Sequence, residues 1–167
     1  QTSPLSPMTI GRGALVLKND SRRFTPRNAS SPLAGNLKPG RPLRGRRSVP
    51  GGGTFYGLFY GHGDDQPLNP DLESKTVSLG MVDNLGDFRG RKISTAVSRS
   101  IRTGTAIGLV LDAAGWTGAR DLDPGVTVIP YWWEEGTDAF DALEKIARSE
   151  GPPALLTIGA DGTMTSV

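Results

Sequence analysis

Residue types on which many catalytic and metal sites depend are absent or nearly absent from this sequence. It contains no cysteine, which excludes disulfides, thiolate catalysis and cysteine-ligated zinc. His62 is its single histidine, so a metal motif that needs two imidazoles cannot exist. No apolar run approaches the roughly 18–20 residues that span a bilayer as a helix. Thiol enzymes, two-histidine metal sites and helical membrane spans are therefore excluded.

Sequence motifs for nucleotides and for activated serine are missing as well. There is no P-loop, no dinucleotide fingerprint and no Gly-x-Ser-x-Gly. The glycine run at residues 51–53 lacks the Lys-Ser/Thr pair and the following helix that a phosphate-binding loop needs, so we interpret it as a hairpin tip. We interpret His62 as an exposed residue where a strand enters a turn. We expect no cofactor, no metal and no catalytic residue.

Two pairs of acidic residues leave one enzymatic alternative open. Asp64 with Asp65, and Glu134 with Glu135 close to Asp138, are carboxylates of the type that glycosidases place ~5–10 Å apart in a cleft. Acids just before a helix more often lie in solvent, where they interact with the positive first turn. The alternative function is therefore a small carbohydrate- or cell-wall-degrading hydrolase, which predicts that replacing these acids abolishes activity.

Charge is distributed unevenly along the chain, although its net value is only +2. Residues 1–50 hold ten Lys and Arg against one acid, Asp20, whereas the remainder holds nine bases and sixteen acids. Such polarity fits head-to-tail contacts between subunits, where unlike faces meet. It also fits nucleic-acid binding by residues 12–47, which predicts an affinity that falls steeply with salt. Phe24 is the one aromatic residue among these bases, so the segment lacks the interleaved aromatic residues that stack on nucleobases, and we favour subunit contacts.

The first half of the sequence predicts strands joined by turns. Short strands are expected at residues 14–17, 41–49, 54–63 and 75–82, with an ordered loop from 23 to 40, a second loop at 64–73 and a turn of helix at 83–88. The strands at 41–49 and 54–63 flank the glycine run and form a hairpin. We expect this part of the chain, to about residue 90, to be β-rich.

Helical periodicity appears after residue 93. A helix is expected from Thr103, its N-cap, to Ala114, with Gly115 as the C′ glycine and Trp116 as the apolar residue that follows it. After a loop at 120–124 and a strand at 126–129, an amphipathic helix with Thr137 as N-cap runs to residue 150. A hairpin closed by residues 161–162 follows. The fold class is therefore α+β.

Several short phrases, in fixed order, carry a resemblance to a known family. They are Leu17-x-Asn19, Arg23-Phe24-x-Pro26-x-Asn28, Ser31-Pro32-Leu33, the residues 37–42, Leu58-Phe59-Tyr60-Gly61, the strand 77–83, Val110-Leu111-Asp112-Ala113-x-Gly115-Trp116, and residues 142–151 and 158–164. In order and spacing they resemble the tail hub, or tail-associated (minor tail), proteins of long-tailed bacteriophages, in particular those of actinobacterial phages and prophages. The resemblance covers about residues 10–167.

The resemblance implies a fold and a role. The fold would be a tail-tube-like β-barrel or sandwich domain, residues 1–90, with an α+β insertion, residues 91–167, that holds two helices, short strands and the C-terminal hairpin. The role would be that of a non-enzymatic virion protein, a tail-tip or baseplate hub subunit assembled in the bacterial cytoplasm. Its partners would be copies of itself in a trimeric or hexameric ring, other tail proteins (tube, distal tail, tip or fibre) and, transiently, DNA in the lumen.

Because the chain starts with Gln1 and stops soon after its last hairpin, we expect a processed chain or a fragment, incomplete at the C-terminus.

A ring of identical subunits needs a large interface, and aromatic and Arg side chains are the residues most enriched in such surfaces. The predicted interface residues are Arg41, Arg44, Arg46, Arg47, Phe55, Tyr56, Phe59, Tyr60, Trp132 and Trp133.

Overall fold

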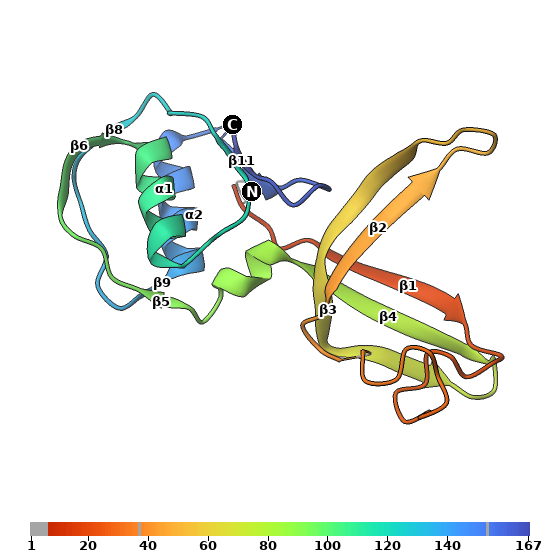
Figure 1. The fold of residues 1–167 in the computed structure, drawn as a ribbon. Coiled ribbons are helices and arrows are strands. Elements are labelled where there is room, and N and C mark those ends of the chain that lie inside the picture. The colour runs from red at the N-terminus through yellow and green to blue at the C-terminus, as the bar shows by residue number, and fades with distance from the viewer. Residues whose placement is uncertain (1–6, 37, 153) are drawn as a thin grey trace, which may run out of the picture. The chain divides into compact units, whose positions relative to one another are not determined.

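The chain folds into two compact units that are described separately. The computed structural model describes residues 7–36, 38–152 and 154–167, and for residues 65–67 the backbone alone. The sheet unit is Gly11–Asn84, and the helical unit is Leu85–Val167 together with residues 7–10 (Figure 1). Most elements are strands and two are α-helices, which confirms the α+β class.

The sheet unit contains four antiparallel strands. They are β1 (Arg12–Lys18), β2 (Pro42–Ser48), β3 (Phe55–Asp71) and β4 (Thr76–Asp83), in the order β1-β4-β3-β2. β4 alternates between small or polar and larger apolar residues, and its Val77, Met81 and Val82 are buried. The strands predicted at 14–17, 41–49, 54–63 and 75–82 are therefore confirmed.

The sheet is open. β1 pairs with β4 and β2 pairs with β3, and among the described residues no strand joins β1 to β2. One copy of the chain therefore does not make the closed barrel that the resemblance implies. Both outer strands present backbone donors and acceptors with no partner strand, and such edges can pair with another chain.

The predicted loop at residues 64–73 is wrong, because β3 continues to Asp71. After an irregularity that begins at Gly63, Leu68 pairs with Leu79, and pairing with β4 continues to Asp71 and Thr76. Pro70 lies within this stretch. Proline has no N–H to donate, so strands tolerate it at a free edge, and β2 pairs only with residues 55–62 of β3.

The long loop before β2 is ordered by a series of turns, as predicted. Asn19 is buried, and its side chain accepts a hydrogen bond from the Phe24 amide at 2.9 Å and donates one to Thr25 Oγ1 at 3.1 Å. Ser31 is also buried and donates from its hydroxyl to the Arg23 carbonyl at 2.5 Å. Polar side chains thus form the hydrogen bonds that backbone N–H and C=O groups of this loop would otherwise make with a neighbouring strand.

The helical unit packs its two helices against one core. The helices are α1 (Thr103–Ala113) and α2 (Ala139–Glu150). The flanking elements are η1 (Asn84–Phe88), β5 (Lys92–Ile93), β6 (Ser98–Arg102), β7 (Arg120–Leu122), β8 (Val128–Trp132), β9 (Thr137–Asp138), β10 (Leu156–Ile158) and β11 (Met164–Ser166). β5 pairs with β9, β6 with β8, and β11 with both β10 and β7.

The core of the helical unit is apolar and shows why residues before 90 belong to it. Leu85 and Phe88 of η1 are each 1% exposed in this core, and Met8 joins it from the N-terminal side. The boundary between the units therefore lies at residues 84 and 85. No helix among the described residues has the length and apolarity to cross a bilayer.

The helix ends agree with the sequence in one case and differ in two. Trp116 donates to the Leu111 carbonyl, and Gly115, at φ 68°, donates to the Asp112 carbonyl, so α1 ends in the predicted Schellman motif. Thr103 is the first residue of α1 rather than its cap; Arg102 occupies that position and makes no side-chain cap.

The N-cap of α2 is Asp138 rather than the predicted Thr137. The Asp138 side chain accepts a hydrogen bond from the Phe140 amide at 3.1 Å. In the β5–β9 ladder Thr137 pairs with Ile93 and Asp138 with Lys92, so the helix starts one residue later than predicted. Asp138 is therefore both the last residue of the ladder and the cap of α2.

In the helical unit β7 and β8 were not predicted correctly, and β5, β6 and β9 were not predicted at all. β7 occupies residues expected to be a loop, because Arg120–Leu122 pairs in parallel with β11. The strand expected at 126–129 starts two residues later and runs to Trp132, since its partner β6 ends at Arg102, opposite Val128. The C-terminal hairpin is confirmed, with Gly162 at φ 92° in its turn.

Candidate subunit interface

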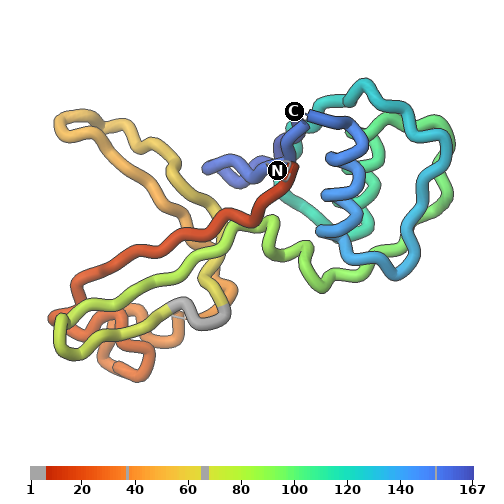
Figure 2. Tube along the Cα trace, turned by 180° about the vertical axis from the view of Figure 1, so that it is seen from behind, coloured from red at the N-terminus to blue at the C-terminus, as the bar shows by residue number. Residues whose placement is uncertain are grey.

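Half of β3 leaves the sheet and forms a two-stranded arm with β2. β3 pairs with β4 only from Gly61 onward, whereas residues before Gly61 pair with β2 alone. We call residues 44–60 the arm; Figure 2 shows it running away from β1 and β4 as a narrow ribbon. Six strand residues, 55–60, give it a length of about 20 Å at roughly 3.3 Å per residue.

Gly61 allows β3 to pass from one partner strand to the other. A Cβ at this position would lie 2.1 Å from the Val82 carbonyl oxygen and 2.8 Å from Asp83 Cα. Only glycine permits such close approach of two backbones. The glycine that ends the aromatic strand therefore marks the base of the arm.

A β-bulge decides which side chains share a face of the arm. Gly45 pairs with Phe59 and Arg46 pairs with Gly57, so Leu58 has no opposite residue in β2. Simple alternation along β3 would place Phe55 with Phe59, but an extra residue reverses the faces beyond it. One face therefore carries Phe55 and Tyr60 with Arg44 and Arg46, and the other carries Tyr56 and Phe59 with Arg47.

The arm exposes large apolar side chains on both faces. Phe55 is 63% exposed, Tyr56 56% and Leu58 63%, whereas Phe59 and Tyr60, nearer the base, are half-buried. An isolated two-stranded ribbon is marginally stable in water, and contiguous exposed apolar surface is typical of interaction sites. The arm therefore has the composition of a surface that another molecule covers.

The arm is also strongly basic. Arg44, Arg46 and Arg47 of the arm and Arg41 just before it are all exposed, and residues 41–63 include no acidic residue. In the part of the chain that the structure describes, none of these four guanidinium groups forms an ion pair. A partner that covers the arm therefore needs carboxylates or other anionic groups beside apolar ones.

The two tryptophans predicted at an interface lie in different environments. Trp132 is 5% exposed and belongs to the core of the helical unit, so its ring is not available to a neighbouring subunit. Trp133 is 54% exposed, beside Tyr131, which is 60% exposed. The guanidinium of Arg99 lies 5.4 Å from the centre of the Tyr131 ring. Trp133 and Tyr131 form a smaller aromatic surface.

Two of the four acids of the hydrolase alternative, Asp64 and Glu134, make structural contacts. Glu134 is 6% exposed and accepts from Lys145 Nζ at 3.3 Å, whereas Glu135 next to it is exposed. Asp64 lies 3.4 Å from Arg12 Nη1, and the side chain of Asp65 lies outside the described residues. No group of three or more metal-ligating side chains is found among the described residues. No observation favours the hydrolase.

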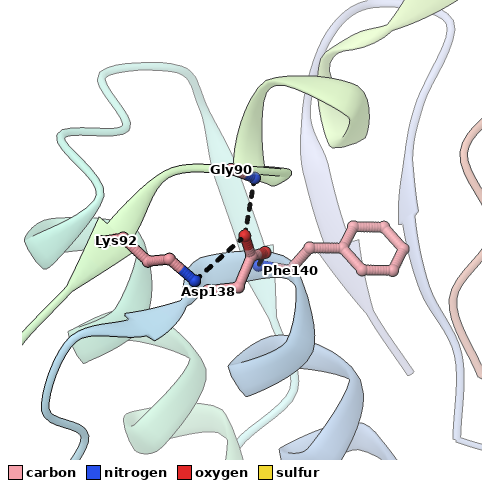
Figure 3. Close-up of polar contacts among 4 residues, drawn as sticks. All are labelled: Gly90, Lys92, Asp138 and Phe140. Carbon is pink, nitrogen blue, oxygen red and sulfur yellow. Dashed lines mark hydrogen bonds and ion pairs between the residues drawn. The ribbon is translucent and has the colours of Figure 1, made fainter.

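Asp138 joins two segments of the helical unit. One of its carboxylate oxygens accepts from the Gly90 amide at 2.6 Å and lies 4.0 Å from Lys92 Nζ, while the other caps α2 at the Phe140 amide (Figure 3). The sequence suggested a carboxylate cluster here. The structure uses Asp138 to fasten the segment before β5 to the start of α2.

Two other carboxylates have lowered pKa values for structural reasons. The Thr103 hydroxyl, 2.5 Å from Glu150, and the amides of Val126 and Thr127 lower the pKa of Glu150 below its ordinary value. The side chain and amide of Ser74, with the Glu73 amide, lower the pKa of Asp71 in the β3–β4 turn. Neither shift is of the kind that prepares a general acid, which requires a raised pKa.

His62 and Leu58 differ from the expectation. His62 lies within β3, between Pro42 of β2 and Val82 of β4, rather than at a strand end. Leu58 was not among the predicted contact residues although it is as exposed as Phe55. It lies at the bulge, next to Gly57, and has no opposite residue in β2. An apolar residue within a basic, aromatic hairpin was the available signal.

Comparison with known proteins shows structural similarity to a prophage tail protein. No protein-family model matches the chain, and no curated protein matches it. The fold is similar to that of the 43 kDa tail protein of prophage MuSo2 from Shewanella oneidensis, with a TM-score of 0.55 and 16% sequence identity. The match covers 95% of this chain and 45% of that protein. The chain thus shares the fold of a prophage tail protein and spans less than half of its length.

Proposed function

We propose that the chain is a structural subunit of a phage tail, of the tail-tip or baseplate hub type, that acts by assembling into a ring with copies of itself. The observation that carries this proposal is the match to a prophage tail protein over 95% of the chain. The order of short sequence phrases supports the same family independently. In this role the protein belongs to the virion, is assembled in the host cytoplasm and catalyses no reaction.

The arm is the part of the chain that we assign to ring formation. A cyclic assembly needs a heterologous contact, in which two different surfaces of one subunit meet on neighbouring copies. The sheet unit offers two different open edges, β1 and β2, and the arm adds exposed apolar surface next to the β2 edge. Edge-to-edge pairing between copies would complete a barrel that one copy leaves open.

Other contacts follow from the same arrangement. The exposed basic residues of the arm would face either an acidic surface of the neighbouring copy or the lumen, where DNA passes. Trp133 and Tyr131 on the helical unit are assigned to contacts with other tail proteins, namely tube, distal tail, tip or fibre. We leave Trp132 out of this surface because it is buried in its own unit.

The mass and symmetry of the particle test the proposal. Native mass spectrometry across a range of protein concentrations, followed by cryo-EM class averages, should show a closed species of three or six copies. A protein that stays monomeric at the highest concentration, with its arm still exposed, would contradict the ring. A variant in which Phe55, Tyr56 and Leu58, the exposed apolar side chains of the arm, are replaced should keep its fold and remain monomeric.

A further inference from the structure

An open apolar groove lies on the sheet unit, beside the residues that precede the arm. Its volume is about 520 Å³, within the roughly 300–1,000 Å³ typical of ligand pockets. Its apolar walls come from β1, β2, β3, β4 and the loop before β2, and they are Leu17, Phe24, Leu33, Leu43, Leu68 and Leu79. These six side chains are only half-buried, so the groove is apolar surface that the chain leaves uncovered.

The polar part of the groove is cationic. Lys38 and Arg41 contribute to its lining, and no carboxylate does so among the described residues. Neither Lys38 nor Arg41 has an ion-pair partner in the described part of the chain. An occupant that matches this surface has an apolar group for the walls and at least one anionic group for the two cations.

A turn of the same unit has the complementary composition. We call residues 71–74, which connect β3 to β4, the acidic turn. Leu72 is 84% exposed at its tip, between Asp71 and Glu73, which are both exposed. The Asp71 carboxylate accepts hydrogen bonds from the amides of Glu73 and Ser74 at 2.9 and 3.2 Å, so the turn is held in one conformation. A preorganised turn loses little entropy on binding.

We propose that the acidic turn of one copy docks into the groove of the next copy, with Leu72 against the apolar walls and Glu73 beside Lys38 and Arg41. In its own copy Leu72 is 84% exposed, so the groove of the same chain does not hold it. Turn and groove are different surfaces, and their contact is therefore heterologous, as a ring requires. This inference rests on the proposed self-assembly and names a second contact within it.

Disulfide trapping tests the contact directly, because the natural chain has no cysteine. Asn36 lines the groove and is exposed, and Ser74 is an exposed residue of the acidic turn, so Asn36→Cys and Ser74→Cys should leave the fold intact and keep Leu72 and Glu73. The two variants, one of them labelled with ¹⁵N, are mixed and oxidised. Mass spectrometry then distinguishes the mixed dimer from both homodimers. Val126→Cys, at an 82% exposed position of the helical unit, replaces Ser74→Cys in the control mixture.

The contact predicts that the mixed dimer of Asn36→Cys and Ser74→Cys is the main product. Glu73→Lys, made in the Ser74→Cys chain, should lower its yield about tenfold at limiting concentration, because it places a cation beside Lys38 and Arg41; a factor of ten corresponds to ~1.4 kcal/mol. Lys38→Glu in the partner chain should restore the yield. Mixed dimers no more abundant than in the Val126→Cys control, in a sample whose native mass shows rings, overturn this contact and leave the ring standing. A sample with monomers only overturns both.

Discussion

Replacing Phe55 by serine tests whether the arm is a contact surface. An aromatic side chain can bury roughly 200 Å² of surface. With 63% of Phe55 exposed in the single chain, about 125 Å² remains available, worth about 3 kcal/mol at ~25 cal/mol per Å² when a partner covers it. Because ~1.4 kcal/mol is a factor of ten, the association constant should fall about 100-fold.

The same substitution should leave the single copy folded. Phe55 is exposed and outside any core, and substitutions at such positions usually change the free energy of unfolding by less than about 0.5 kcal/mol. Sedimentation velocity at several concentrations gives the association constant, and thermal unfolding below the assembly range gives the stability. Val126→Ser, at an 82% exposed position of the helical unit, is the matched control. Unchanged association of Phe55→Ser, or an equal effect of both variants, would refute the reasoning.

Three further predictions concern the helical unit and DNA. Asp138→Ala should lower the free energy of unfolding by about 2–3 kcal/mol, because it removes the cap of α2 and the hydrogen bond from the Gly90 amide. Asp138→Asn should lower it by less than about 1 kcal/mol, because the contact with Lys92 is weak. Equal effects of the two variants in chemical denaturation would contradict this prediction. The pKa of Glu150 in the folded chain lies below its ordinary value of 4.5, so Glu150 stabilises the fold fully above that pH and loses this effect as the pH falls through the folded pKa. Glu150→Gln should therefore flatten the dependence of the free energy of unfolding on pH in the acid range. Parallel plots of stability against pH for the two proteins would disprove this linkage. The chain should bind duplex DNA at micromolar or weaker affinity that falls with salt, and nanomolar, salt-insensitive binding in a fluorescence anisotropy titration would contradict a conduit role.

Local sequence signals predicted the elements whose geometry depends on neighbouring residues. The Schellman end of α1 needs a glycine at positive φ and an apolar residue after it, and Gly115 and Trp116 supply both. The alternation in β4 and the turn at Gly162 are of the same kind. In each case the deciding contacts lie within a few residues along the chain.

Elements that depend on distant pairing were predicted less well. The extension of β3 to Asp71 and the whole of β7 exist because β4 and β11 lie beside them, and neither segment has a strong strand pattern of its own. Thr137 and Asp138 are both good caps, and the β5–β9 ladder, which extends through Asp138, sets the start of α2 at Ala139. Tertiary contacts here override local preference.

The candidate interface residues were chosen by residue type, and their exposure could not be predicted from the sequence. Tyr56 and Trp132 are both aromatic residues in strands, yet Tyr56 is 56% exposed and Trp132 5%. The difference arises because β3 leaves β4 at Gly61, whereas β8 packs its Trp132 under the helices. Leu58 and Leu72 were missed because single leucines in polar or aromatic segments carry no periodic signal.

Hydrogen exchange of the arm tests the central claim most directly. Residues 55–60 pair with β2 alone, so one edge of this segment is open in the single copy. If copies meet through the arm, amide exchange of residues 55–60 should slow as the concentration rises through the assembly range, while core amides of α2 change little. Rings that form while residues 55–60 exchange as fast as in the monomer would show that the arm is not the contact.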